Sequence, residues 1–84
     1  MSATLQRQRW NGQPAHLGDL FRVRKMRGDK QLAAVCQLWT HNFGWEVRLE
    51  INGDLQRSEV FRSQDDVLTA AEAWKAAVTE KGWT

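Results

Sequence analysis

The chain has 84 residues, with five Trp, no Tyr and a formal net charge of +2. This length allows one domain and excludes several. The single cysteine, Cys36, excludes an internal disulfide and fits a reducing compartment. Residues 1–16 lack the apolar segment of a secretory signal peptide, and no run approaches the ~18 apolar residues that span a membrane. We expect a small cytoplasmic protein that does not contact membranes.

The charges are unevenly distributed along the chain. Residues 1–30 hold seven basic and two acidic residues, whereas residues 31–84 hold five basic and eight acidic residues. A basic N-terminal third suggests an acidic partner, such as nucleic acid, an anionic surface or an acidic protein.

Residues 1–17 contain few apolar side chains and show no periodicity, which is typical of a flexible tail; residues 18–84 form the predicted domain. Residues 20–26 alternate loosely and predict a first strand, with Phe21 and Val23 on one face and Arg22 and Arg24 on the other. Residues 27–30 then predict a turn.

Residues 31–40 predict the next strand. One face carries Leu32, Ala34, Cys36 and Leu38, and the other carries Ala33, Val35, Gln37 and Trp39. Residues 41–44 predict a four-residue hairpin loop in which Gly44 supplies any positive φ.

Residues 45–51 alternate strictly between apolar and polar side chains, which predicts a half-buried antiparallel strand. Asn52-Gly53 follows and is the strongest short hairpin signal. Residues 55–62 predict the return strand, whose polar middle is typical of a sheet edge. A two-residue loop pairs Val47 with Ser58, whereas a three-residue loop places Leu55 and Phe61 on the core face. The sequence leaves both registers open.

Ser63 is a suitable N-cap for a C-terminal helix, and Asp65 and Asp66 suit the positive end of its dipole. Lys81 falls in the expected last turn and Gly82 at the C′ position. Trp83 follows at C″, where an apolar side chain commonly packs back onto the last turn of the helix. The apolar stripe of this helix consists of Val67, Leu68, Ala71, Trp74 and Val78.

These elements predict an α+β fold: a three- to four-stranded antiparallel meander with one C-terminal helix packed on one face. The predicted core consists of Leu32, Ala34, Cys36, Leu38, Trp45, Val47, Leu49, Ile51, Val67, Ala71, Trp74 and Val78.

Signals of enzymatic chemistry are poor, and we expect a protein that is not an enzyme. Cys36 and His41 are five positions apart on a strand or its end and so fall on opposite faces. His16 lies in the predicted tail. One Cys and two scattered His do not supply the ligands of a structural zinc site. No metal, cofactor or small-molecule ligand is indicated.

The sheet face away from the helix is the most interesting predicted surface. It carries Val35 and Trp39, which call for a cover: the first strand with Trp10, a second copy of the chain, or a ligand. Basic and aromatic side chains on one sheet can grip phosphates and stack on bases. The candidate interaction or nucleic-acid surface consists of Arg22, Arg24, Lys25, Arg27, Val35, Trp39 and Arg48.

Two resemblances follow from these residues. The segments 44–49, 57–60, 74–77 and 81–83 are similar to small bacterial proteins, proteobacterial above all, to which no function is assigned. Three antiparallel strands and a helix starting at Ser63 also resemble, in architecture, the AP2-type and integrase arm-type DNA-binding domains. The resemblance implies a DNA-reading sheet, but Glu46, Glu50 and Glu59 interrupt the basic face here.

We therefore carry two functional hypotheses. The first is a protein-interaction or self-associating module, based on the Val35 and Trp39 face. The second is a nucleic-acid-binding domain that uses the basic first strand, with Trp39 stacking on a base.

Overall fold

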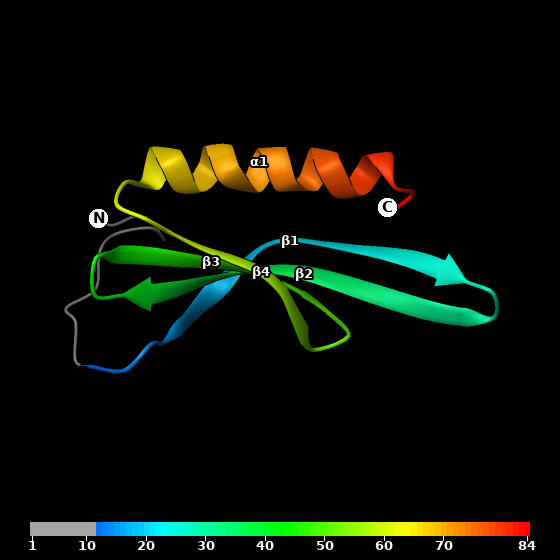
Figure 1. The fold of residues 1–84 in the computed structure, drawn as a ribbon, viewed down its shortest axis with the longest axis horizontal. Helices are drawn as coiled ribbons and strands as arrows, with labels where there is room; N and C mark the ends of the chain where they lie inside the picture. The colour runs from blue at the N-terminus through cyan, green and yellow to red at the C-terminus, as the bar shows by residue number, and fades with distance from the viewer. Residues whose placement is uncertain (1–11) are drawn as a thin grey trace.

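The computed structural model describes residues 12–84, so most of the predicted tail, including Trp10, lies outside the described residues. It contains strands β1 (His16–Arg27), β2 (Lys30–His41), β3 (Gly44–Ile51) and β4 (Asp54–Phe61), followed by helix α1 (Gln64–Glu80). The strands form one antiparallel sheet in the order β1-β2-β3-β4. Helix α1 lies across one face of this sheet (Figure 1). The predicted α+β meander is confirmed, with four strands.

The core lies between α1 and the sheet. Of the predicted core residues, all are buried except Leu32, Ile51 and Val78, which pack against the core from its margin. Phe21, Val23 and Trp83 join this core. The prediction was wrong for Leu68 on the helix stripe, which is 47% exposed. No helix in the described part of the chain is long and apolar enough to cross a membrane.

Both ends of α1 follow their predicted caps. Ser63 Oγ accepts the Asp66 backbone N–H at 3.1 Å, which satisfies one of the first helical donors. At the other end, Gly82 has φ +95°. The Gly82 N–H donates to Thr79 O and the Trp83 N–H donates to Val78 O. This pair of bonds is the Schellman motif. Lys81 is the cap residue itself and does not lie in the last turn.

Strand β1 begins at His16, inside the range predicted as tail, and pairs with β2 up to Arg27↔Lys30. Two register shifts, at Leu17 and at Leu20, interrupt this ladder. Each bulge adds one residue, so the alternation of faces restarts after it. Asp19 and Arg22 therefore face the same way although they are three positions apart, which in a regular strand would place them on opposite faces.

The β3–β4 hairpin combines parts of the two registers that the sequence left open. Its turn has two residues, with Ile51 paired to Asp54. A register shift between Leu49 and Glu50 follows, after which Trp45 pairs with Phe61. Phe61 is therefore partly buried against the core, while Leu55 stays exposed.

Gly44 stands where β4 passes closest to the β2–β3 turn. The prediction of a four-residue loop was wrong here: the turn has two residues, because His41 pairs directly with Gly44. Gly44 is buried with φ +140°, and a Cβ there would clash with the carbonyl oxygen of Phe61. Glycine is required here both by conformation and by space.

Candidate functional site

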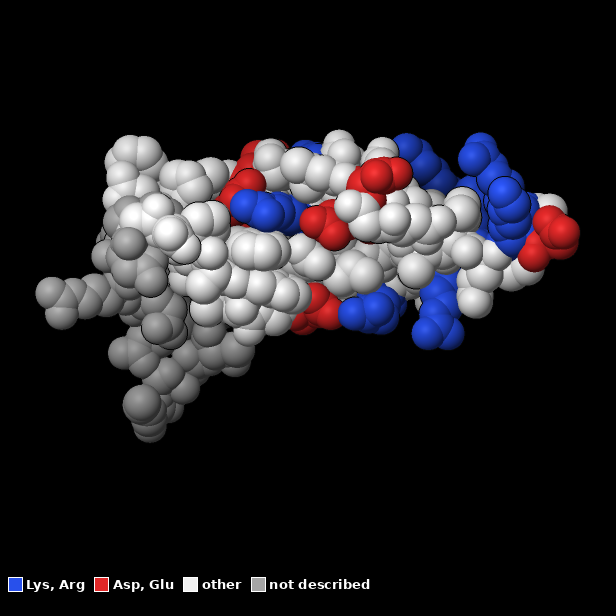
Figure 2. Space-filling view, turned by 90° about the horizontal axis from the view of Figure 1, so that it is seen from below, with Lys and Arg blue, Asp and Glu red and all other residues white. Residues whose placement is uncertain are grey.

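The sheet face opposite α1, here called the open face, carries no second layer among the described residues. Figure 2 shows the molecule from this side. Neutral side chains occupy the part nearest the grey atoms, acidic and basic side chains adjoin in the middle, and basic side chains gather toward the far end. The charged side chains of this view therefore lie in its middle and toward its far end.

Trp39 lies on the open face and is half-buried. The His16 ring stacks on it with the centroids 5.0 Å apart and the planes 18° apart. The Arg48 guanidinium carbon lies 4.1 Å from the Trp39 ring centroid, a cation–π contact of about 0.5–2 kcal/mol. Trp39 Nε1 donates to Gln37 Oε1 at 2.9 Å. Trp39 is thus held by side chains of both neighbouring strands, β1 and β3, and of its own strand β2.

Ion pairs neutralise much of the charge on the open face. Arg48 donates to Glu46 at 2.9 Å, and these side chains are only 24% and 17% exposed. Arg22 donates to Asp19 at 2.8 Å, and His16 Nε2 lies 3.2 Å from the other Asp19 oxygen. Arg48 Nε is buried and has no hydrogen-bond partner among residues 12–84. The middle of this face is therefore nearly balanced in charge and offers phosphates little net attraction.

Beyond the end of β3, β1 and β2 continue as a two-stranded ribbon, residues 24–33, here called the basic ribbon. Figure 1 shows this end of the hairpin extending past the other strands. It carries Arg24, Lys25, Arg27 and Lys30, and Asp29 is its one acidic residue. Within the described part of the chain, none of these four cations forms an ion pair.

The C-terminal end of α1 contacts the basic ribbon on the sheet face opposite the open face. Lys25 Nζ donates to the carbonyl oxygen of Lys81 at 2.6 Å, and the Thr84 N–H donates to Arg24 O at 2.9 Å. The last turn of α1 contains no basic residue of its own. Lys25 therefore supplies the positive charge that the negative end of the helix dipole favours.

Cys36 is fully buried, and burial, with a smaller contribution from the charge of Asp19, raises the pKa of its thiol to about 12. The thiol therefore stays protonated at neutral pH and is a poor nucleophile there. His41 Nδ1 accepts the Phe43 N–H at 3.1 Å in the β2–β3 turn. Among the described residues, no three His, Cys, Asp or Glu side chains gather into a metal-binding group.

The seven predicted surface residues are divided between two faces. Five of them lie on the open face, where the Arg48 guanidinium stacks on the Trp39 ring: Arg22, Arg24, Val35, Trp39 and Arg48. Lys25 and Arg27 lie toward the α1 side, where Lys25 is bonded to Lys81. The structure therefore does not bring the predicted residues together as one site.

Sequence reasoning missed His16 and Asp19 as open-face residues, because the two bulges of β1 shift the alternation. The aromatic and acidic character of these side chains upstream of Arg22 was the available signal. It also missed the groove beside Trp83, which joins residues far apart in sequence.

No known protein family, curated protein or solved structure matches this chain. Its resemblances to bacterial proteins and to AP2-type and integrase arm-type domains thus stay predictions, and the function is inferred from the side chains described above.

Proposed function

We propose that this chain is a non-enzymatic module that binds the phosphate backbone of nucleic acid through the basic ribbon. The observation that carries the proposal is the gathering of Arg24, Lys25, Arg27 and Lys30 on a projecting ribbon that has one acidic residue. Arg and Lys side chains make most of the phosphate contacts in protein–nucleic acid complexes. A two-stranded ribbon also fits the width of the DNA major groove.

The proposal locates binding on the ribbon and away from Trp39. The ion pairs of the open face already occupy Arg22 and Arg48, whereas Arg24, Arg27 and Lys30 have no carboxylate partner among the described residues. Four phosphate contacts predict a slope of log K against log salt of about −3 to −4. Affinity then falls about a hundredfold between about 50 and 200 mM salt.

The test is fluorescence anisotropy with labelled random duplex DNA and single-stranded RNA at these two salt concentrations. The variant Arg24→Gln/Lys30→Gln removes two ribbon cations, and the control Arg62→Gln/Lys75→Gln removes two cations elsewhere with the same change in net charge. We expect at least a tenfold loss of affinity for the ribbon variant and a salt slope about two units shallower. The control should stay within twofold.

Equal losses in the two variants would show that binding follows net charge alone and would overturn the assignment to the ribbon. If tens of micromolar protein do not bind the labelled nucleic acids even at low salt, the proposal itself is overturned.

Self-association through the open face is the second candidate, and the balanced Glu46–Arg48 pair favours it. This pair is largely removed from water, and exposed Val60 is the register partner of Glu46. Pairing along β4 is less favoured, because its register shift and the inward-facing Arg57 and Glu59 protect this sheet edge from pairing with another chain.

Self-association through the open face is tested by analytical sedimentation of the wild type and of Val60→Lys, with Leu68→Lys as an exposed control. A mass independent of concentration would exclude it.

A further inference from the structure

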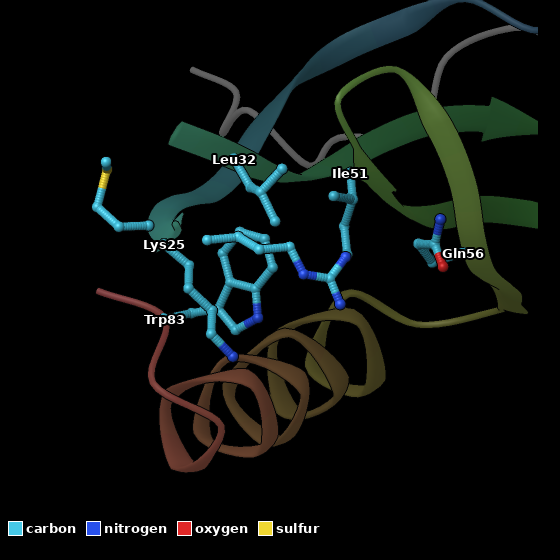
Figure 3. Close-up of a pocket in the computed structure, with 7 residues that line it drawn as sticks. Lys25, Leu32, Ile51, Gln56 and Trp83 are labelled. Carbon is cyan, nitrogen blue, oxygen red and sulfur yellow. The ribbon is translucent and has the colours of Figure 1, made fainter. Parts of the chain in front are cut away.

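A groove of about 360 Å³ opens beside the C-terminal end of α1, on the sheet face that α1 covers. It is lined by Lys25, Met26, Arg27, Leu32, Ile51, Gln56 and Trp83. Figure 3 shows the Trp83 indole between the end of the helix and the sheet, with Leu32 and Ile51 above it and Gln56 across the gap. This volume lies in the range of small-ligand sites.

The floor of the groove is apolar and held in place by the core. Trp83 is 6% exposed and belongs to the core cluster, while Leu32 and Ile51 pack partly buried against that cluster. The Schellman bonds at the end of α1 fix the backbone of Trp83. A flat apolar group laid on this floor would therefore meet a preformed surface and would order few side chains.

The polar lining consists of two cations and one amide, with no acidic residue. Lys25 and Arg27 come from β1 and Gln56 from the shifted part of β4. Lys25 is already hydrogen-bonded to the Lys81 carbonyl, whereas Arg27 forms no ion pair among the described residues. A planar guanidinium suits a carboxylate better than any other common anion-binding side chain, because it offers two parallel donors.

We propose that this groove binds a small organic anion with a flat apolar body, of the aromatic carboxylate class. The apolar body lies on Leu32, Ile51 and Trp83, and the carboxylate pairs with Arg27. Lys25 adds positive charge at the same end of the groove, and the Gln56 amide offers a polar contact on the opposite wall. This site shares Lys25 and Arg27 with the basic ribbon of the proposed function, whereas Arg24 and Lys30 do not line the groove and so distinguish the two sites.

Naphthalene-2-carboxylate is a suitable probe, and naphthalene-2-methanol is its uncharged counterpart. Titration of the ¹⁵N-labelled chain, followed by NMR, should give saturable shifts at the amides of Leu32, Ile51 and Gln56 and at the Trp83 indole N–H. For a ligand of this size we expect a Kd on the order of a millimolar or somewhat tighter. The uncharged probe should bind at least tenfold more weakly.

Arg27→Gln and Lys30→Gln form a matched pair of variants, because these residues are register partners at the end of the ribbon and only Arg27 lines the groove. Arg27→Gln should weaken binding of naphthalene-2-carboxylate about tenfold and leave the uncharged probe unaffected. Lys30→Gln should change it less than twofold while still weakening nucleic-acid binding. Gln56→Ala should weaken only the small anion.

The proposal is overturned if neither probe gives saturable shifts at the groove residues, or if Lys30→Gln weakens binding as much as Arg27→Gln. Shifts centred on the open face would also overturn it. None of these results bears on nucleic-acid binding, which is measured separately.

Discussion

The two halves of the β1–β2 hairpin have the same backbone pairing but different surroundings. In the half built from His16–Val23 and residues 34–41, β3 lies alongside and α1 lies above, and Phe21, Val23 and Cys36 are buried. In the basic ribbon no third strand from residues 12–84 is paired, and the positions that continue the buried row are Lys25 and Arg27. The comparison shows that alternation is sufficient to predict a strand, whereas the burial of its side chains depends on which other elements pack over them.

The largest effect is expected from Trp74→Ala, which removes the helix side chain over the packed half. Trp74 is 4% exposed, and the Arg57 guanidinium carbon lies 4.3 Å from its ring centroid. We expect a loss of about 3–5 kcal/mol in the free energy of unfolding, measured in urea. The control Leu68→Ala on the exposed side of α1 should cost about 0.5 kcal/mol or less. A near-neutral Trp74→Ala would contradict the helix face described here.

The second effect is a decrease in the free energy of unfolding at alkaline pH, caused by the ionisation of Cys36 in the unfolded chain. Because its pKa is raised from 9.0 to about 12 in the folded chain, the unfolded thiol ionises first. Its contribution to stability is complete below pH 9 and is lost as pH rises toward 12, by up to about 1.4 kcal/mol per pH unit. Urea unfolding between pH 8 and 10.5 should show a shallower decline for Cys36→Ala than for wild type. Parallel curves would show that Cys36 does not contribute.

Ser63→Ala tests the start of α1, at the end away from the basic ribbon. Loss of the hydrogen bond from the Asp66 N–H to Ser63 Oγ should lower the free energy of unfolding by about 1 kcal/mol. Ser63→Asp retains an acceptor and should be close to wild type in urea unfolding. If both substitutions cost the same, the cap contributes through something other than this bond.

The smallest effect concerns the end of α1, where Lys25 joins the ribbon to the helix. Lys25→Met removes the ammonium from the Lys81 carbonyl and should cost about 0.3–1 kcal/mol, with the larger share at low salt. Lys75→Met, on the exposed side of α1, is the control. A Lys25 effect as large as that of Trp74 would mean that the ribbon and the packed half form one equally buried unit.

Local signals were sufficient to predict β3, the Asn52-Gly53 turn and both helix caps, because strict alternation, turn chemistry and capping act within a few residues. The bulges at Leu17, at Leu20 and in β4 were not predicted, because each interrupts the local alternation on which the strand predictions depend. Phe61, for example, reaches the core margin only because β4 shifts its register.

The candidate site was less predictable than the fold. The basic residues of the ribbon were found from charge and grouped on one surface, although alternation from Phe21 and Val23 already places Lys25 and Arg27 on the α1 side. Trp83 was expected to pack on its own helix turn. Its part in a groove with Leu32 and Ile51 depends on where the helix end meets the sheet, which no local pattern encodes.

The contact between Lys25 and Lys81 also bears on the order in which the molecule folds. Each strand pairs with its neighbour in sequence, so the hairpins close through short loops and form early. The Lys25–Lys81 bond spans 56 residues, and it cannot form until the sheet and α1 are both in place. The groove and the contacts between the ribbon and the end of α1 therefore form last. The same contacts should open first in native-state hydrogen exchange, with the amide of Thr84 exchanging ahead of those of β3.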